Sequence, residues 1–171
     1  MQSNEALLLK LIQSVRLFGG FSQDEARLFL SASQFEQHPA GKRLLTEGED
    51  GSELYVLLSG QVSVRRFGGV SEHELARLGP GETFGELSLV DFGWRSASVE
   101  ALEEVRVLVF KRASLSRLPA LETKLYRNLA ILLASRLRET DARLTELVEQ
   151  AADQDAFQKL AETTHRNAYL G

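Results

Sequence analysis

Between Gln34 and Arg112 the chain consists of short runs of alternating apolar and polar residues separated by glycines. Alternation with a period of two places successive side chains on opposite faces of a strand, so each run predicts a half-buried β-strand. Many short strands with glycine turns between them are typical of a sandwich or barrel. The chain has 171 residues, which is enough for a domain to bury a core of its own. The glycines that separate the runs include Gly41, Gly48, Gly51, Gly60, Gly68, Gly69, Gly79 and Gly81.

Two tight hairpins are predicted within this region. The runs 53–58 and 61–67 flank Ser59-Gly60, and the runs 99–101 and 105–110 flank Glu103-Glu104. Short turn sequences between two alternating runs favour pairing of those neighbouring strands.

Helices are predicted before the strands. Residues 4–17 have helical spacing of apolar side chains, and Gly19-Gly20 ends the pattern. Ser22 with Glu25 forms a capping-box sequence, which predicts a second helix from Gln23 to Ala32. The apolar positions of the two helices are Leu7, Leu8, Leu11, Ile12 and Val15 in the first, and Ala26, Phe29 and Leu30 in the second.

A long helix is predicted after the strands, and it has two possible uses. Its early part, with Leu125, Leu129 and Leu132, suits packing on the chain's own sandwich. From Tyr126 onward two sets repeat every seven residues, the spacing of a coiled-coil seam. The later part is charged on most sides, which favours a parallel helix pair in a homodimer. The seam sets are Ala130, Leu137, Leu144 and Ala151, and Tyr126, Leu133, Thr140 and Leu147.

The run 84–99 carries the candidate chemistry. After the Pro80-Gly81 turn, residues 86–90 can form one helical turn entered through Gly85, and such a turn directs backbone N–H groups at an anion. Arg95 follows, and a guanidinium matches two oxygens of one phosphate. Glu86 is an acceptor suited to a sugar hydroxyl. These residues predict a site for a phosphorylated sugar; the alternatives are solvated surface charges or a structural pair of Arg95 with Glu86.

Phe84-Gly85-Glu86, then eight residues, then Arg95-Ser96-Ala97 resembles the phosphate-binding cassette of the cyclic nucleotide-binding domain family. The spacing is similar to that of protein kinase A regulatory subunits and cyclic nucleotide-gated channels. Trp94 stands where the family often has proline. The strand-region glycines and Leu17-Phe18-x-x-Phe21-Ser22 resemble the family too, including the catabolite activator proteins.

The resemblance implies a mainly β fold with flanking helices: a β jelly-roll (double-stranded β-helix) with N-terminal helices and a long C-terminal helix. Its implied divisions are 1–33, an N-terminal helical segment; 34–112, the nucleotide-binding jelly-roll; and 113–171, the C-terminal helices with a dimerisation and lid helix and a short tail. The implied function is binding cyclic AMP or cyclic GMP, with occupancy coupled to the last helix, and no catalysis.

The site residues follow from the same resemblance. Arg95, the N–H groups of the 85–87 turn and those of Ser96-Ala97 would hold the cyclic phosphate, and Glu86 would accept from the ribose 2′-hydroxyl. Thr140 and Asp141 align with a threonine–serine pair that faces the base in catabolite activator proteins; Asp141 departs from serine. The competing role of Thr140 is to set helix register. The full ligand set is Phe84, Gly85, Glu86, Leu87, Ser88, Arg95, Ser96, Ala97, Thr140 and Asp141.

Cyclic AMP is favoured over cyclic GMP because of Thr140, and a cyclic dinucleotide stays open. Arg95→Ala is expected to abolish binding with little loss of stability, since the side chain would serve an anion and not the core. The rival hypotheses are a nucleotide-blind dimeric scaffold and a jelly-roll enzyme of the cupin type. The latter is disfavoured because His38, His73 and His165 are scattered.

Several partners are not expected. The sequence has no cysteine, and together with the scattered histidines this predicts no metal site. A net charge of −4 argues against a basic surface for nucleic acid, and 153–171 is too short for a winged helix-turn-helix, so a stand-alone domain without DNA binding is expected. No signal peptide or membrane span is recognised, which predicts a cytoplasmic protein. A protein effector is possible, and extension of the native chain past Gly171 stays open.

Overall fold

The computed structural model describes residues 9, 10, 12, 14–90 and 93–168, with only the backbone described for 120 and 153–168. The chain forms two units, residues 1–130 and residues 131–171, and each is described here by itself.

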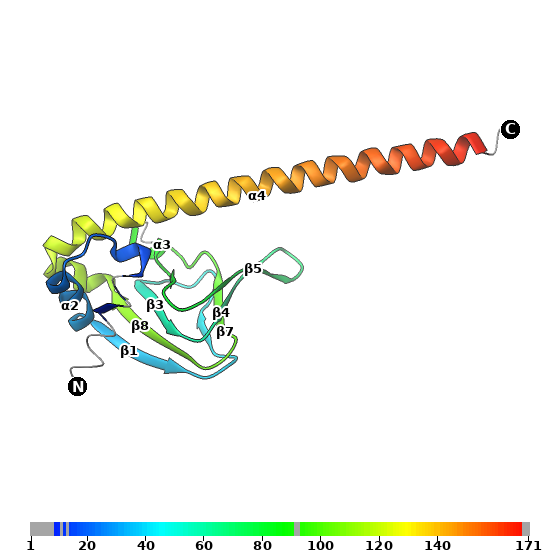
Figure 1. Cartoon of the computed structure of the whole chain (residues 1–171). Coiled ribbons are helices and arrows are strands. Elements are labelled where there is room, and N and C mark those ends of the chain that lie inside the picture. The colour runs from blue at the N-terminus through cyan, green and yellow to red at the C-terminus, as the bar shows by residue number, and fades with distance from the viewer. Residues whose placement is uncertain (1–8, 11, 13, 91–92, 169–171) are drawn as a thin grey trace. The chain divides into compact units, whose positions relative to one another are not determined.

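The first unit is built on two antiparallel sheets of four strands each, counted over its described residues (Figure 1). One sheet has the order β1 (Ser33–His38), β8 (Val105–Lys111), β3 (Glu53–Ser59), β6 (Thr83–Phe84). The other has the order β2 (Arg43–Leu45), β7 (Ser98–Ala101), β4 (Val62–Phe67), β5 (Glu72–Leu78). Sequential strands alternate between the sheets at several points, as in a β jelly-roll. The predicted mainly β fold with flanking helices is confirmed.

Both predicted tight hairpins are wrong. β3 pairs with β6 and β8, whereas β4 pairs with β5 and β7, so Ser59-Gly60 carries the chain from one sheet to the other. The β7–β8 connection crosses between sheets at the same corner, where the Leu102 N–H donates to the Gln61 carbonyl at 2.9 Å. Alternation identifies a strand but not its partner. The hairpin that does form joins β4 to β5, closed by the Gly68 N–H donating to the Ser71 carbonyl at 2.9 Å.

The helices before the sheets agree with the sequence pattern where they are described. Residues 9, 10, 12 and 14 are helical, and a 3₁₀ turn η1 (Arg16–Phe18) follows; Leu7, Leu8 and Leu11 lie outside the described residues. Helix α2 (Gln23–Ser31) begins with the predicted capping box. In it the Glu25 N–H donates to Ser22 Oγ at 3.2 Å and the Ser22 N–H to Glu25 Oε2 at 2.7 Å.

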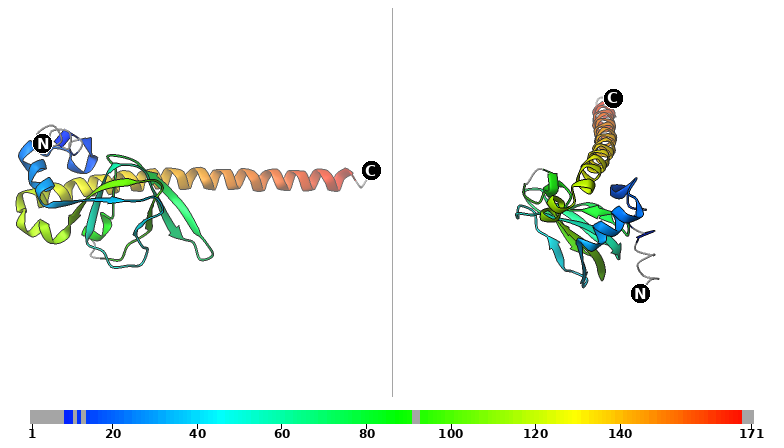
Figure 2. Two further views of the ribbon diagram at one scale, coloured as in Figure 1. Left: turned by 90° about the horizontal axis from the view of Figure 1, so that it is seen from below. Right: turned by 90° about the vertical axis from the view of Figure 1, so that its left-hand side faces the viewer.

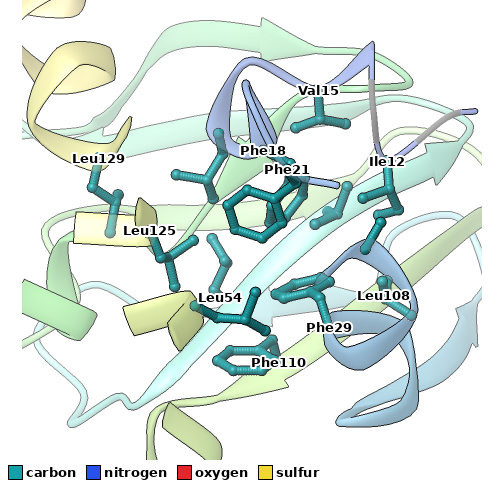
Figure 3. Close-up of a cluster of buried hydrophobic side chains, with 14 of the residues drawn as sticks. Ile12, Val15, Phe18, Phe21, Phe29, Leu54, Leu108, Phe110, Leu125 and Leu129 are labelled. Carbon is teal, nitrogen blue, oxygen red and sulfur yellow. The ribbon is translucent and has the colours of Figure 1, made fainter. Parts of the chain in front are cut away.

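An aromatic cluster joins these helices to the first sheet. The ring centroids of Phe18 and Phe29 lie 4.4 Å apart, and those of Phe29 and Phe110 lie 4.7 Å apart. Leu125 and Leu129 pack into the same cluster (Figure 3). Each such side chain contributes roughly 1.5–3 kcal/mol by leaving water. A second cluster, between the two sheets, includes Leu57, Val62, Val99 and Val107.

The first turns of the long helix belong to this unit. A 3₁₀ segment η2 (Arg112–Arg117) leads into α4 (Pro119–Ala168). The buried Asn128 side chain donates to the carbonyls of Leu17 at 2.9 Å and Gly19 at 2.8 Å, which holds the start of α4 against the N-terminal helices (Figure 2). The predicted packing of Leu125 and Leu129 on the chain's own core is confirmed.

The second unit is the remainder of α4. Its described side chains from Leu137 to Ala152 are exposed, and they include Leu137, Leu144 and Leu147 at 62%, 59% and 62% exposure. Over the described residues, none of the helices combines the length and the apolar character needed to cross a bilayer.

Candidate functional site

The predicted single helical turn entered through Gly85 is present, and it follows a short strand, β6, that was not predicted. β6 ends at Phe84, Gly85 has a φ of 76°, and α3 (Leu87–Val90) follows, one residue shorter than predicted. Gly85 is required for space as well as for conformation, because a Cβ there would lie 2.8 Å from Arg95 Nη1 and 2.8 Å from the Glu53 carbonyl oxygen.

Arg95 lies inside this turn rather than on the surface, with 5% of its area exposed. Its Nη1 donates to the carbonyls of Glu53 at 2.9 Å and Gly85 at 3.1 Å, and to Ser88 Oγ at 2.7 Å. Its Nη2 donates to Glu53 Oε2 at 2.8 Å. Arg95 therefore pairs with Glu53. The premise that it serves only an anion is wrong, so the expectation of little stability loss in Arg95→Ala has to be revised.

Both terminal nitrogens of the Arg95 guanidinium, Nη1 and Nη2, donate hydrogen bonds to the protein. A guanidinium has five N–H donors, and its Nε–H and one Nη–H form a parallel fork that matches two oxygens of a phosphate. Within the part of the chain that the structure describes, Arg95 Nε donates to no protein acceptor and Nη2 donates only to Glu53. The arginine is thus held in place by acceptors at Nη1 and Nη2, and its Nε–H is the donor with no described protein acceptor.

Gly51 makes room for this arrangement. A Cβ at Gly51 would lie 2.0 Å from Arg95 Nε and 2.3 Å from Cζ, so the Gly51 backbone covers the guanidinium directly. Sequence reasoning interpreted Gly51 only as a turn residue and did not single out Glu53 at all. No local pattern marks either one, because both are brought to Arg95 by the contact between the β2–β3 loop and the cassette.

The other cassette residues occupy different environments. Glu86 is buried at 3% exposure, and Ser88 is buried with its Oγ donating to the Gly85 carbonyl at 3.1 Å. Phe84 stacks on Tyr55 with centroids 4.9 Å apart and packs in the core between the sheets. Leu87 and Ser96 are exposed, and Ala97 is half-buried. The structure brings the predicted residues of 84–88 and 95–97 together in one unit.

Thr140 and Asp141 belong to the second unit. Both are exposed on α4, where Thr140 Oγ1 donates to the Arg136 carbonyl at 2.8 Å. Their contact with a nucleotide base stays a prediction.

The Glu53 carboxylate gives the site a pH dependence. Burial alone would raise the pKa of Glu53, but the Ser52 N–H and the Arg95 charge outweigh it and lower this pKa. Glu53 therefore adds stability that is fully present above the unfolded-state pKa, about 4.3 for glutamate. That contribution is lost as the pH falls through the lower folded-state pKa.

We expect Glu53→Gln to flatten the acid limb of the stability profile. Urea midpoints measured from about pH 5 down to about pH 3 should fall less steeply in the variant than in the wild type. Exposed Glu49, in the loop just before β3, provides the matched control, since Glu49→Gln makes the same change without removing the carboxylate paired with Arg95. Equal slopes for Glu53→Gln and wild type would mean that Arg95 does not hold this carboxylate in solution.

The described residues contain no group of three or more His, Cys, Asp or Glu side chains placed to hold a metal ion. Of the described histidines, His38 Nε2 lies 2.9 Å from Glu36 Oε2, and His73 Nε2 lies 3.3 Å from Ser71 Oγ.

A family model and individual known proteins both match this chain. Residues 35–120 match the cyclic nucleotide-binding domain family. The chain is 43% identical over 147 residues to the cyclic AMP receptor protein of Thermus thermophilus, which covers 82% of this chain and 66% of that protein. It therefore spans less than two thirds of the length of this relative.

Solved structures of related proteins have a fold similar to that of this chain. The catabolite activator protein of Thermus thermophilus superposes with a TM-score of 0.67 at 44% identity, covering 77% of this chain and 62% of that one. A cyclic nucleotide-binding domain from Methylobacillus flagellatus superposes with a TM-score of 0.72 at 32% identity, covering 82% of each chain.

Proposed function

Because the chain belongs to the cyclic nucleotide-binding domain family, we propose that it binds cyclic AMP in preference to cyclic GMP and couples occupancy to its C-terminal helix. The single observation that carries the proposal is Arg95, a buried guanidinium held by protein acceptors at Nη1 and Nη2 while its Nε–H has no described protein acceptor. The name of the Thermus relative, a cyclic AMP receptor, supports the choice of nucleotide.

In the proposed complex the Arg95 fork and the N–H groups of the 85–87 turn and of Ser96-Ala97 hold the cyclic phosphate. Glu86 accepts from the ribose 2′-hydroxyl, and Thr140 with Asp141 covers the base. No nucleophile or general base is assigned, so the module is proposed as a sensor rather than an enzyme. A ligand shifts the helix only if it interacts differently with two helix positions.

Titration calorimetry of the chain against each nucleotide tests the proposal, after bound nucleotide has been removed by unfolding and refolding. We expect micromolar or tighter binding of cyclic AMP, about −8 kcal/mol, and weaker binding of cyclic GMP. Thr140→Ala should reduce that preference without removing binding. A folded protein that binds neither nucleotide would refute the proposal and favour a dimeric scaffold, and binding only of a cyclic dinucleotide would change the ligand.

We also propose that the second unit pairs in a parallel homodimer. The seam leucines Leu137, Leu144 and Leu147 are each about three-fifths exposed in the single chain, and they follow the heptad spacing of a helix pair. Thr140 sits on this seam, so one residue would serve both the pairing and the ligand.

Leu144→Glu should shift the chain toward monomer, raising the dimer dissociation constant at least about tenfold because a carboxylate would be placed in an apolar seam. Thr145→Glu adds the same charge on the next residue, away from the seam, and is the matched control. Sedimentation equilibrium measures both, and equal dissociation constants would refute pairing through this face.

Further proposals concern the domain boundaries, the location and the signalling partner. We propose the functional division 1–33, 34–112 and 113–171, a cytoplasmic location, and signalling through an unidentified protein effector. Direct DNA binding by these residues is not proposed.

A further inference from the structure

Arg112 touches both segments that hold Arg95. It is the first residue of η2, directly after β8. Its backbone N–H donates to the Ser52 carbonyl at 2.8 Å, and its Nη1 donates to the Ser88 carbonyl at 2.9 Å. One residue thus joins the loop before β3 to the helical turn α3.

These two contacts lie one step from the anion-binding guanidinium. Ser88 accepts from Arg95 at its Oγ while its carbonyl accepts from Arg112. Ser52 donates its N–H to Glu53 Oε2 at 3.1 Å, and the same oxygen accepts from Arg95 Nη2. A displacement of Arg95 by a ligand would therefore shift Ser52 and Ser88, whose carbonyls accept hydrogen bonds from Arg112.

The contact at Ser88 meets a specific need of α3. The last four carbonyls of any helix have no partner within it, and α3 has only four residues. Besides the bonds within α3 itself, the Leu89 N–H donates to the Glu86 carbonyl at 3.1 Å. A charged donor on the Ser88 carbonyl holds such a short turn in place more firmly than a neutral one.

On its other side Arg112 leads into the helix that is proposed to respond. Leu115 of η2 is buried in the aromatic cluster. The Leu118 N–H donates to the Leu115 carbonyl at 2.8 Å, and α4 begins at the next residue, Pro119.

We infer that Arg112 is a positioning residue: it holds α3 in the conformation that presents Arg95, and it connects the cassette to η2 and the start of α4. The inference rests on the proposed function for the ligand, but the hold on α3 is a property of the ligand-free protein.

The test compares Arg112→Met with Arg117→Met, which removes the exposed arginine at the other end of η2. Arg112→Met should weaken cyclic AMP binding about tenfold by calorimetry and speed amide exchange at Leu89 about tenfold by NMR in the ligand-free protein. Arg112→Lys, which keeps a cationic donor, should recover part of both. Arg117→Met should match the wild type.

The inference is overturned if Arg112→Met keeps wild-type affinity and Leu89 exchange, even with a lower melting temperature, because the residue would then only support the fold. If Arg112→Met does not fold, Arg112→Gln, which removes the charge, takes its place, and unchanged affinity and exchange in that variant overturn the inference equally. A wild-type chain that binds no cyclic nucleotide refutes the proposed function, while Leu89 exchange still decides the hold of Arg112 on α3.

Discussion

Gly51→Ala is expected to abolish cyclic nucleotide binding although it substitutes none of the side chains proposed to bind the ligand. A Cβ at this position would lie 2.0 Å from Arg95 Nε and 2.7 Å from Nη2. Gly51 does not have a positive φ, so alanine is tolerated by its own backbone and the effect is a collision with the guanidinium. The displaced fork would lose two charge-assisted hydrogen bonds, each about 1.5–3 kcal/mol, which corresponds to at least about a hundredfold loss of affinity.

Gly79→Ala is the matched control, since a Cβ there meets only Glu82 Oε2, at 3.9 Å. It should bind cyclic AMP as the wild type does. Calorimetry measures both variants, with circular dichroism to establish that they are folded. Wild-type affinity in Gly51→Ala would mean that Arg95 in its observed position is not the anion-binding group.

Arg95→Ala is expected to abolish binding and also to destabilise the fold. The change deprives the Glu53 carboxylate of its cation and removes the Arg95 donor from the carbonyls of Glu53 and Gly85, of which the Gly85 carbonyl still accepts from Ser88 Oγ. Breaking a fully buried ion pair costs about 3–5 kcal/mol. The Glu53 side chain is 29% exposed, so water screens part of that cost and we expect about 2 kcal/mol from urea unfolding.

A double-mutant cycle separates the two effects. In the Glu53→Gln background Arg95→Ala should cost less stability, because no unpaired carboxylate remains, yet binding should stay absent. If Arg95→Ala is as stable as the wild type, the Arg95–Glu53 pair contributes nothing to the fold. If Arg95→Ala retains wild-type affinity, the proposed phosphate site is wrong.

Local patterns predicted the parts of the fold that depend on near neighbours in the chain. The Ser22–Glu25 capping box, the turn after Gly85 and the strand character of 53–59 all rest on residues within a few positions of one another. The hairpin predictions failed because strand pairing depends on distant segments. β3 lies next to β8, some fifty residues further on, rather than next to β4.

The candidate site also has features that depend on near neighbours in the chain and features that depend on distant segments. The types and spacing of Phe84, Gly85, Glu86 and Arg95 indicated an anion-binding cassette, and the family match supports that interpretation. Nothing in those residues predicted that Arg95 would be buried on a Glu53 carboxylate beneath Gly51, or that Arg112 would hold Ser88. Because Arg95 is paired with Glu53, Arg95→Ala is expected to cost more stability than the cassette residues alone predicted.

The sequence alone determined the class of fold and the residue types suited to a phosphorylated sugar, because periodicity, turn chemistry and motif spacing are local properties of the chain; the cyclic phosphate was implied by the resemblance of the cassette to the family. Only the tertiary structure decided that Arg95 is buried and which of its N–H groups donate to the protein. That arrangement depends on acceptors from Glu53 at the start of β3, from Gly85 and from Ser88 of α3, and Arg112 at the β8–η2 junction donates to the Ser88 carbonyl. These segments lie up to about sixty residues apart in sequence and meet only when the two sheets pack.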